Sequence, residues 1–204
     1  MSDKDVARFN ERATHYETDW LGRNVHQQVR RRALDLAAAA NPAPAAILDV
    51  GCGTGALLRA AADRFPAATR TGIDAAAQMI KIASEADPAA RLLMAPAEDL
   101  PFDDDAFDLV VSSNSFHHWP DQQAGIAEIG RVLRRGGALV LVDPFAIGLL
   151  RPWSVLIGKA DRMRTKADVE AMLAAAELGS ARWDPVLGFG PLPMIHAVTA
   201  SSSR

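Results

Sequence analysis

The stretch that decides the fold is ILDVGCGTGALL, residues 47–58. An apolar run containing one acid, Asp49, leads into three glycines in five positions, Gly51, Gly53 and Gly55, before apolar residues resume. Glycine at that density destabilises a regular element, so the pattern predicts a strand, a ligand-binding loop and then a helix. The alternative is a tight turn packed on its own helix, for which one glycine would suffice.

Short apolar runs alternate with helical patterns through the middle of the chain. Runs covered on both faces are typical of parallel strands, and we expect strands at 45–50, 69–74, 91–94, 107–112 and 138–143. Helices are expected at 56–64, 76–86 and 121–135, the last with Asp121 as N-cap and Gly136-Gly137 as its stop. This alternation predicts a doubly wound, Rossmann-like α/β fold.

Two flanking regions complete the predicted domain, which spans residues 1–204. Residues 1–40 read as an amphipathic helical cap or lid, with a stripe formed by Phe9, Ala13, Tyr16 and Trp20. After the core at 45–145, residues 146–166 could cover an acceptor. Residues 167–204 read as a last helix, entered by a capping box at Thr165 and Asp168 and ended by Gly179, followed by a hairpin. The hairpin brings the mostly parallel sheet to seven strands, with an antiparallel strand near its end.

Composition excludes several classes of function. The net charge is −3, so no global basic field favours nucleic acid, and Arg30-Arg31-Arg32 reads as a solvated helix face. Cys52 is the sole cysteine, which excludes an internal disulfide and a cysteine-rich zinc site, and Asn114 and Asp143 are too few to predict a metal. With no signal core and no apolar run of about 20 residues, we expect a cytoplasmic monomer or homodimer without stable membrane insertion.

The glycine loop allows two kinds of ligand. Gly51, Gly53 and Ala56 satisfy the dinucleotide pattern, so an NAD(P)-dependent oxidoreductase is one alternative. Asp49 argues against it, because a carboxylate is an awkward neighbour for a pyrophosphate but suits a ligand with an ammonium group. The Tyr-x-x-x-Lys pair of short-chain reductases is also missing, since the only tyrosine, Tyr16, is followed by Trp20 at the lysine position.

Residues 45–145 resemble the class I S-adenosylmethionine-dependent methyltransferases. The resemblance lies in LDVGCGTG, GIDAAAQMI, AEDLPFDDDAFDLVVSSNSFHHW and EIGRVLRRGGALVLVDP, which occur in the family's order. The small-molecule branch that includes quinone-biosynthesis enzymes is the most similar. The resemblance implies S-adenosylmethionine as cofactor, S-adenosylhomocysteine as product and a small organic molecule as acceptor.

The resemblance also implies roles for individual residues. Gly51, Cys52, Gly53 and Ser113 would line the methionine half of the cofactor, with Asp49 near its amino group. Asp74 would hold the ribose hydroxyls, Ala75 and Met79 would flank the adenine, and Ala97 and Glu98 would meet its edge. Two positions depart from the family pattern: Pro96 cannot bond the adenine amino group, and Ala76 replaces a common serine helix cap.

The expected chemistry is in-line attack on a sulfonium methyl group, which a positioning, desolvated pocket can accelerate. Where the nucleophile must lose a proton, His117 or His118, which follow the fourth strand, are candidate bases. Tyr16, Trp20, Phe145 and Trp153 could form aromatic walls for an apolar or ring-containing acceptor. A cofactor-binding protein without catalysis stays a third possibility.

Overall fold

The structure is a computed structural model that describes residues 3–12, 20–147, 162–189 and 192–203. Two of the residues predicted to contact the acceptor, Tyr16 and Trp153, lie outside the described residues, and Trp20 is described for its backbone only. No helix in the described part of the chain is long and apolar enough to cross a membrane.

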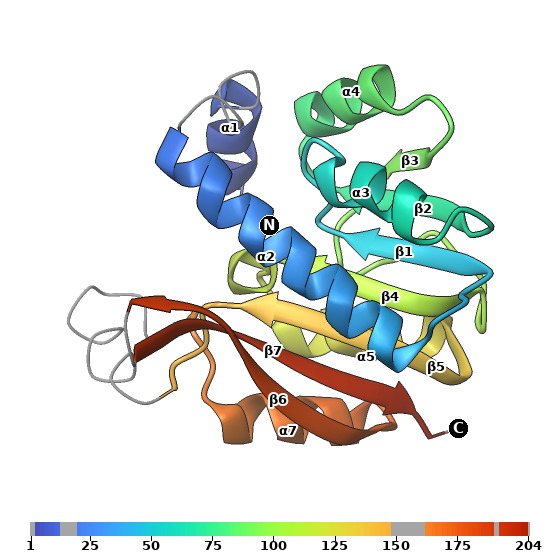
Figure 1. Cartoon of the computed structure of the whole chain (residues 1–204), viewed down its shortest axis with the longest axis vertical. Helices are drawn as coiled ribbons and strands as arrows, with labels where there is room; N and C mark the ends of the chain where they lie inside the picture. Colours follow the sequence, from blue (N-terminus) through green and yellow to red (C-terminus); the bar gives the residue numbers. More distant parts are fainter. Residues whose placement is uncertain (1–2, 13–19, 148–161, 190–191, 204) are drawn as a thin grey trace.

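Seven strands form one sheet in the order β3-β2-β1-β4-β5-β7-β6 (Figure 1). Strands β1 to β5 run parallel, and β7 is antiparallel to both β5 and β6. The strands are β1 (Ala46–Val50), β2 (Thr69–Asp74), β3 (Arg91–Met94), β4 (Phe107–Ser113), β5 (Leu133–Asp143), β6 (Leu178–Phe189) and β7 (Leu192–Ser202). The predicted fold class is confirmed, including the antiparallel strand of the final hairpin.

Helices cover both faces of the sheet (Figure 1). They are α1 (Asp3–Arg12), α2 (Trp20–Ala40), α3 (Ala56–Arg64), α4 (Ala77–Ala86), α5 (Gln122–Val132) and α7 (Lys166–Ala175), with a short 3₁₀ helix, η2 (Phe116–His118). Helices α2 and α3 pack on one face through residues such as Val29, Ala33 and Leu57. Helices α5 and α7 pack on the other through Ile126, Ile129 and Val169. Strands β1, β4, β5 and β7 therefore supply alternate side chains to two separate cores.

Two helix ends differ from their predicted positions. The helix expected to run to residue 135 ends at Val132, because Leu133 is extended (φ −75°, ψ 133°) and pairs with Phe107 of β4. Gly136 and Gly137 lie inside an irregular start of β5 instead of stopping a helix. Gly179, expected as a C-cap, lies in β6, because Glu177 makes the left-handed turn (φ 56°). Strand pairing overrides the local stop signals in both places.

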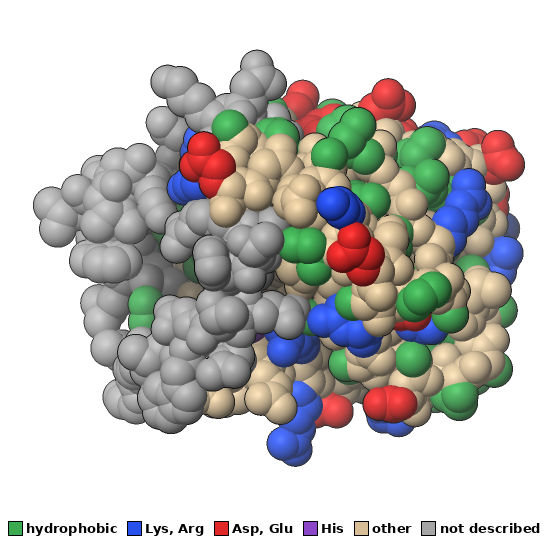
Figure 2. All heavy atoms as spheres, turned by 90° about the horizontal axis from the view of Figure 1, so that it is seen from above, with side chains coloured by type: hydrophobic (Ala, Val, Ile, Leu, Met, Phe, Trp, Pro, Cys, Tyr) green, Lys and Arg blue, Asp and Glu red, His purple; other side chains and the backbone are tan. Residues whose placement is uncertain are grey.

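Two predicted helix caps are confirmed. The Asp121 side chain accepts a hydrogen bond of 3.0 Å from the Ala124 amide at the start of α5. Thr165 and Asp168 form the complete capping box of α7. On the face seen in Figure 2, the described acidic, basic and apolar side chains are interspersed.

Candidate functional site

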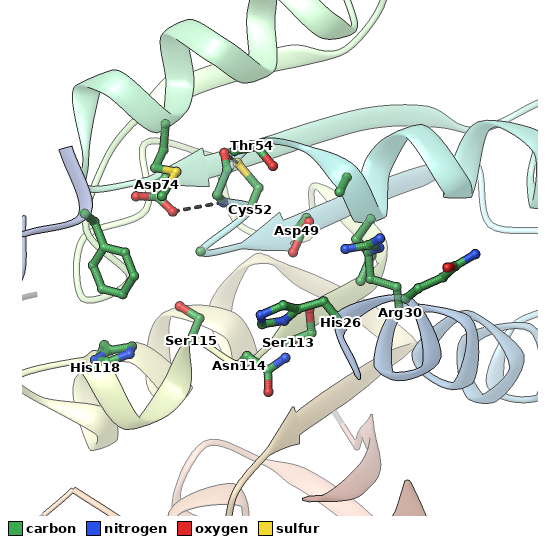
Figure 3. Close-up of a pocket in the computed structure, with 17 residues that line it drawn as sticks. His26, Arg30, Asp49, Cys52, Thr54, Asp74, Ser113, Asn114, Ser115 and His118 are labelled. Carbon is green, nitrogen blue, oxygen red and sulfur yellow. Dashed lines mark hydrogen bonds between the residues drawn. The ribbon is translucent and has the colours of Figure 1, made fainter. Parts of the chain in front are cut away.

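A cavity opens at the carboxyl ends of β1, β2 and β4, where the strand order reverses on either side of β1 (Figure 3). Open α/β sheets bind ligands at this switch point. The cavity is lined by Phe9 of α1, by His26, Gln27 and Arg30 of α2, by Asp49, Gly51, Cys52, Gly53, Thr54, Ala56 and Leu57 around the glycine loop, by Asp74 and Met79, and by Ser113, Asn114, Ser115 and His118 after β4.

The glycine loop needs its glycines for two different reasons. Gly51 has φ +76°, and a Cβ atom there would lie 1.8 Å from the Ser115 hydroxyl, so the loop after β4 packs directly on its backbone. Gly53 has φ +53°, and a Cβ atom there would meet no other atom within 4 Å. Its bare backbone therefore leaves room for a ligand at the cavity wall.

The amide groups of this loop bond to the protein itself. Gly51 and Cys52 both donate to the Ile73 carbonyl at 2.9 Å, and Gly53 donates to the Asp74 carboxylate at 3.0 Å (Figure 3). A dinucleotide site would present such amides to a pyrophosphate. These three amides are engaged elsewhere, which argues against the nicotinamide alternative.

Asp49 is the chemically most unusual residue of the cavity. Its side chain is 1% exposed, and neither carboxylate oxygen has a hydrogen-bond partner. Burial, and secondarily the negative charge of Asp74, raises the pKa of Asp49 to about 8. A buried carboxylate without a partner is costly. A cationic hydrogen-bond donor in the cavity would supply the missing bonds, so the site fits a ligand that carries an ammonium group.

Asp74 lies across the cavity from the α2 side chains (Figure 3). One of its oxygens accepts from Gly53 and the other from the Ala76 amide at 2.8 Å. Burial raises the pKa of Asp74, and these backbone bonds oppose the rise. Each carboxylate oxygen can accept a further hydrogen bond, so Asp74 fits a ligand that offers hydroxyl groups. Burial also raises the pKa of the neighbouring Cys52 thiol, which keeps it unreactive.

Helix α2 contributes residues that the sequence analysis did not assign to the site. His26 and Arg30 extend from α2 toward the cavity on the side opposite Asp74 (Figure 3). Arg30 was expected on a solvated face, but it is half-buried at the cavity. The helical period gives a partial signal, because 26 and 30 are one turn apart and flank the buried Val29. The sequence pattern of α2 does not indicate that His26 and Arg30 lie beside the glycine loop.

Helix α1 closes another side of the cavity. Phe9 packs with Ala76, Met79 and Ile82 of the α4 region and stands edge-on to His118, with ring centroids 5.0 Å apart. Asn10 accepts a 2.9 Å hydrogen bond from the Gln78 amide. Ala76, the N-cap residue of α4, has no side chain that can cap the helix. Asn10 of α1 takes over this role by accepting from the Gln78 amide.

The predicted site residues fall into two groups. Eight line the cavity: Asp49, Gly51, Cys52, Gly53, Asp74, Met79, Ser113 and His118. Others lie outside its lining. Ala97 is buried, and a Cβ atom on Gly125 would approach it at 3.5 Å. Glu98 accepts from the Asp121 amide at 3.2 Å. Phe145 is buried between Phe116 and Trp183. Ala75 is half-buried after β2.

The two candidate bases have different surroundings. His117 Nδ1 lies 2.8 Å from Asp143 Oδ1, and Asp143 is 1% exposed at the end of β5. His118 lines the cavity instead, and its ring centroid is 3.9 Å from that of His117. A histidine bonded through one nitrogen to a buried carboxylate has a fixed orientation. No group of three or more His, Cys, Asp or Glu in the described residues could hold a metal ion.

Fold and site together define a class of protein. It is a doubly wound α/β protein whose switch-point cavity suits a ligand with an ammonium group and hydroxyl groups, rather than a pyrophosphate. Comparison with known proteins agrees. Residues 48–141 match the family model described as a methyltransferase domain. Residues 48–141 therefore form the core of a class I S-adenosylmethionine-dependent methyltransferase domain.

Individual relatives support this assignment. The chain is 41% identical over 118 residues to demethylmenaquinone methyltransferase of Thermus thermophilus, covering 56% of this chain and 53% of that protein. It is 37% identical over 145 residues to nocamycin O-methyltransferase of Saccharothrix syringae, covering 67% of this chain and 50% of the relative. The matched part thus spans about half the length of these two relatives.

A solved structure shares the fold over nearly the whole chain. It is described as a complex between the Haloferax volcanii Trm112 methyltransferase activator and the putative methyltransferase. The TM-score is 0.78 at 20% identity, and the match covers 96% of this chain and 98% of that one. At that identity the likeness establishes the fold alone.

Proposed function

We propose that this protein transfers the methyl group of S-adenosylmethionine to a small, apolar or ring-containing organic acceptor. The single observation that carries the proposal is Asp49, a fully buried carboxylate without a partner at the switch point. The amino group of the cofactor is the cation that would satisfy it. When bound, the cofactor supplies the electrophilic methyl group, and the chain positions its two ends.

The charges around the cavity match the two ends of that cofactor. Asp49 would hold the ammonium group, and Arg30, which lines the cavity from α2, would face the carboxylate. Asp74 would accept hydrogen bonds from the ribose hydroxyls, while Met79 and Phe9 would pack on the adenine. Ala75, Ala97 and Glu98 stay predictions from the family resemblance.

Of the two histidines, we propose His117 as the base. Asp143 holds its Nδ1, so Nε2 is the nitrogen left to take a proton from the acceptor. Asp143 acts as a positioning residue and stabilises the imidazolium that forms. His118 would serve as a cavity wall. The contact between His117 and Asp143 supports an enzyme over a cofactor-binding protein without turnover, which would have no need for an oriented base.

The acceptor itself has to be identified by experiment. Relatives of this chain are named for different acceptors, among them trans-aconitate and nocamycin. Incubating the protein with methyl-labelled S-adenosylmethionine and a metabolite extract should yield labelled products that mass spectrometry identifies. Calorimetry should show binding of S-adenosylmethionine and S-adenosylhomocysteine but not of NAD or NADP. Tight NAD binding would contradict the proposal.

Asp74→Ala should weaken cofactor binding by about 1–3 kcal/mol, because the ribose hydroxyls lose a charged acceptor. Part of the loss would come from the loop, since Gly53 loses its own bond to Asp74. Asp74→Asn keeps one carbonyl acceptor and should lose less. Titration calorimetry of both variants checks this, and an alanine variant with unchanged affinity would exclude the ribose role.

Asn10→Ala should destabilise the docking of α1 on α4 by about 0.5–2 kcal/mol, the usual cost of a lost helix cap. If α1 acts as a lid, the variant should release S-adenosylhomocysteine several-fold faster while the melting temperature of the core changes little. Asn10→Asp, which can still accept from the Gln78 amide, is the matched control. Stopped-flow release rates measure the effect, and identical rates in all three proteins would contradict the lid.

A further inference from the structure

Beside the proposed base lies a second pair of buried polar side chains, Asp143 and His196. They are directly opposite each other as the last pair in the antiparallel register of β5 and β7. Both are more than nine-tenths buried, at 1% and 8% exposure. Neither Asp143 Oδ2 nor His196 Nδ1 has a hydrogen-bond partner, although Asp143 Oδ1 bonds to His117.

The two side chains project from the same face of the sheet. Leu139 and Leu141 of β5 and Val198 and Ala200 of β7 belong to one core cluster, and alternation places Asp143 and His196 on that same face. Opposing residues of an antiparallel pair have Cβ atoms about 4.5–5.5 Å apart. The two side chains are therefore neighbours on that face, where a small group lying between them could contact both unsatisfied atoms.

The neighbours of His196 on the same face of β7 are apolar, whereas Asp143 also contacts His117. Met194 precedes His196 by two residues on β7 and packs with Ala146 and Met163. Burial lowers the pKa of His196, which favours its neutral imidazole. A neutral imidazole with its proton on Nδ1 donates one hydrogen bond, and a carboxylate accepts one. A hydroxyl group can meet both needs at once, whereas an ammonium only donates and a carboxylate only accepts.

We propose that Asp143 and His196 form a subsite that binds a hydroxyl group of the methyl acceptor, distinct from the group whose proton His117 takes. The inference rests on the proposed methyl transfer and specifies its substrate class: an apolar, ring-containing molecule with a second hydroxyl group close to the methylated position. Asp143 would then have two roles. Its Oδ1 orients the base His117, and its Oδ2 binds the second hydroxyl group of the acceptor.

The stability cost of the pair supports a binding role. Unsatisfied buried polar groups destabilise a folded protein, and an apolar replacement of similar shape is often neutral or stabilising. His196→Leu should therefore melt at the same temperature as the unchanged protein or higher. A histidine that served only to support the fold would give the opposite result.

Catechol and phenol are suitable probes, because they differ by one hydroxyl group. Protein saturated with S-adenosylhomocysteine is titrated with each in a calorimeter, and catechol should bind about tenfold more tightly, as expected for one hydrogen bond. His196→Leu should abolish the preference, and His196→Asn, whose amide can replace Nδ1, should restore most of it. Ser202→Ala is the matched control, since Ser202 also has a buried hydroxyl without a partner but lies at the far end of β7.

The outcomes separate the two proposals. Failure to bind S-adenosylhomocysteine contradicts the proposed function. Three results would overturn the subsite and leave the proposed function standing, provided that cofactor binding is intact. They are equal affinity for catechol and phenol, no binding of either, and an unchanged preference in His196→Leu.

Discussion

Asp49→Asn should weaken S-adenosylmethionine binding at least a hundredfold at pH 7.5. The replacement keeps the shape of the side chain but removes the charge that would face the cofactor's ammonium group. Loss of one partner from a buried ion pair costs about 3–5 kcal/mol, and each 1.4 kcal/mol is a factor of ten in affinity. Titration calorimetry measures the change, and Asp63→Asn, which alters an exposed acid on α3, is the control.

The pH dependence of binding tests the same residue independently. With a pKa of about 8, Asp49 carries a proton at pH 7 in the ligand-free protein and must release it to pair with a cation. Affinity should therefore rise by nearly tenfold per pH unit below pH 8. Calorimetry at pH 7 in two buffers of different ionisation enthalpy should count about one proton released. The asparagine variant should show neither effect, and a flat profile in the unchanged protein would contradict the pairing.

The free energy of unfolding of the cofactor-free protein should fall as the pH rises, whereas cofactor affinity should increase. The folded-state pKa of Asp49 lies above its ordinary value of 3.8, so between these values the folded state holds a proton that the unfolded state releases. The stabilisation from this proton is fully present below about pH 4 and is lost as the pH rises to about 8. In denaturant titrations without cofactor, the stability of Asp49→Asn should fall less between pH 4 and pH 8 than that of the unchanged protein.

His117→Ala should lower turnover by about 10²–10⁴-fold, the usual contribution of a general base, with cofactor affinity unchanged. The reason is that Asp143 fixes the ring through Nδ1 and leaves Nε2 to take the acceptor's proton. Asp143→Asn keeps the shape of the positioning residue but removes its charge, so it should also lower turnover. Single-turnover assays with labelled cofactor separate this loss from effects on product release.

His118 provides the comparison within the same turn. It lines the cavity and contacts Phe9, so His118→Ala should affect cofactor affinity more than the chemical step. Added imidazole should restore part of the turnover of His117→Ala but not of His118→Ala. If both variants turn over as fast as the unchanged protein, catalysis rests on positioning alone, and the proposal that His117 is a base is wrong.

The sequence by itself determined the fold class and the meeting of Asp49 and Asp74 with the glycine loop. Apolar runs alternating with helical patterns fix a doubly wound sheet, because each strand must be covered on both faces. The carboxyl ends of parallel strands share one edge of the sheet. Acids ending two such strands, Asp49 and Asp74, therefore had to meet beside the glycine loop. The sequence pattern was sufficient to predict this contact, because Asp49 and Asp74 lie at or near the ends of their strands.

Only the tertiary structure decided the remaining parts of the site. His26 and Arg30 reach the cavity because α2 crosses the sheet beside α3, which no helical pattern specifies. The bonds of Asn10 to Gln78 and of His117 to Asp143 join residues 68 and 26 positions apart. The pairing of Asp143 with His196 depends on the register of β7. Helix periodicity and strand alternation set which face a side chain takes, but strand order and register set which neighbour it meets.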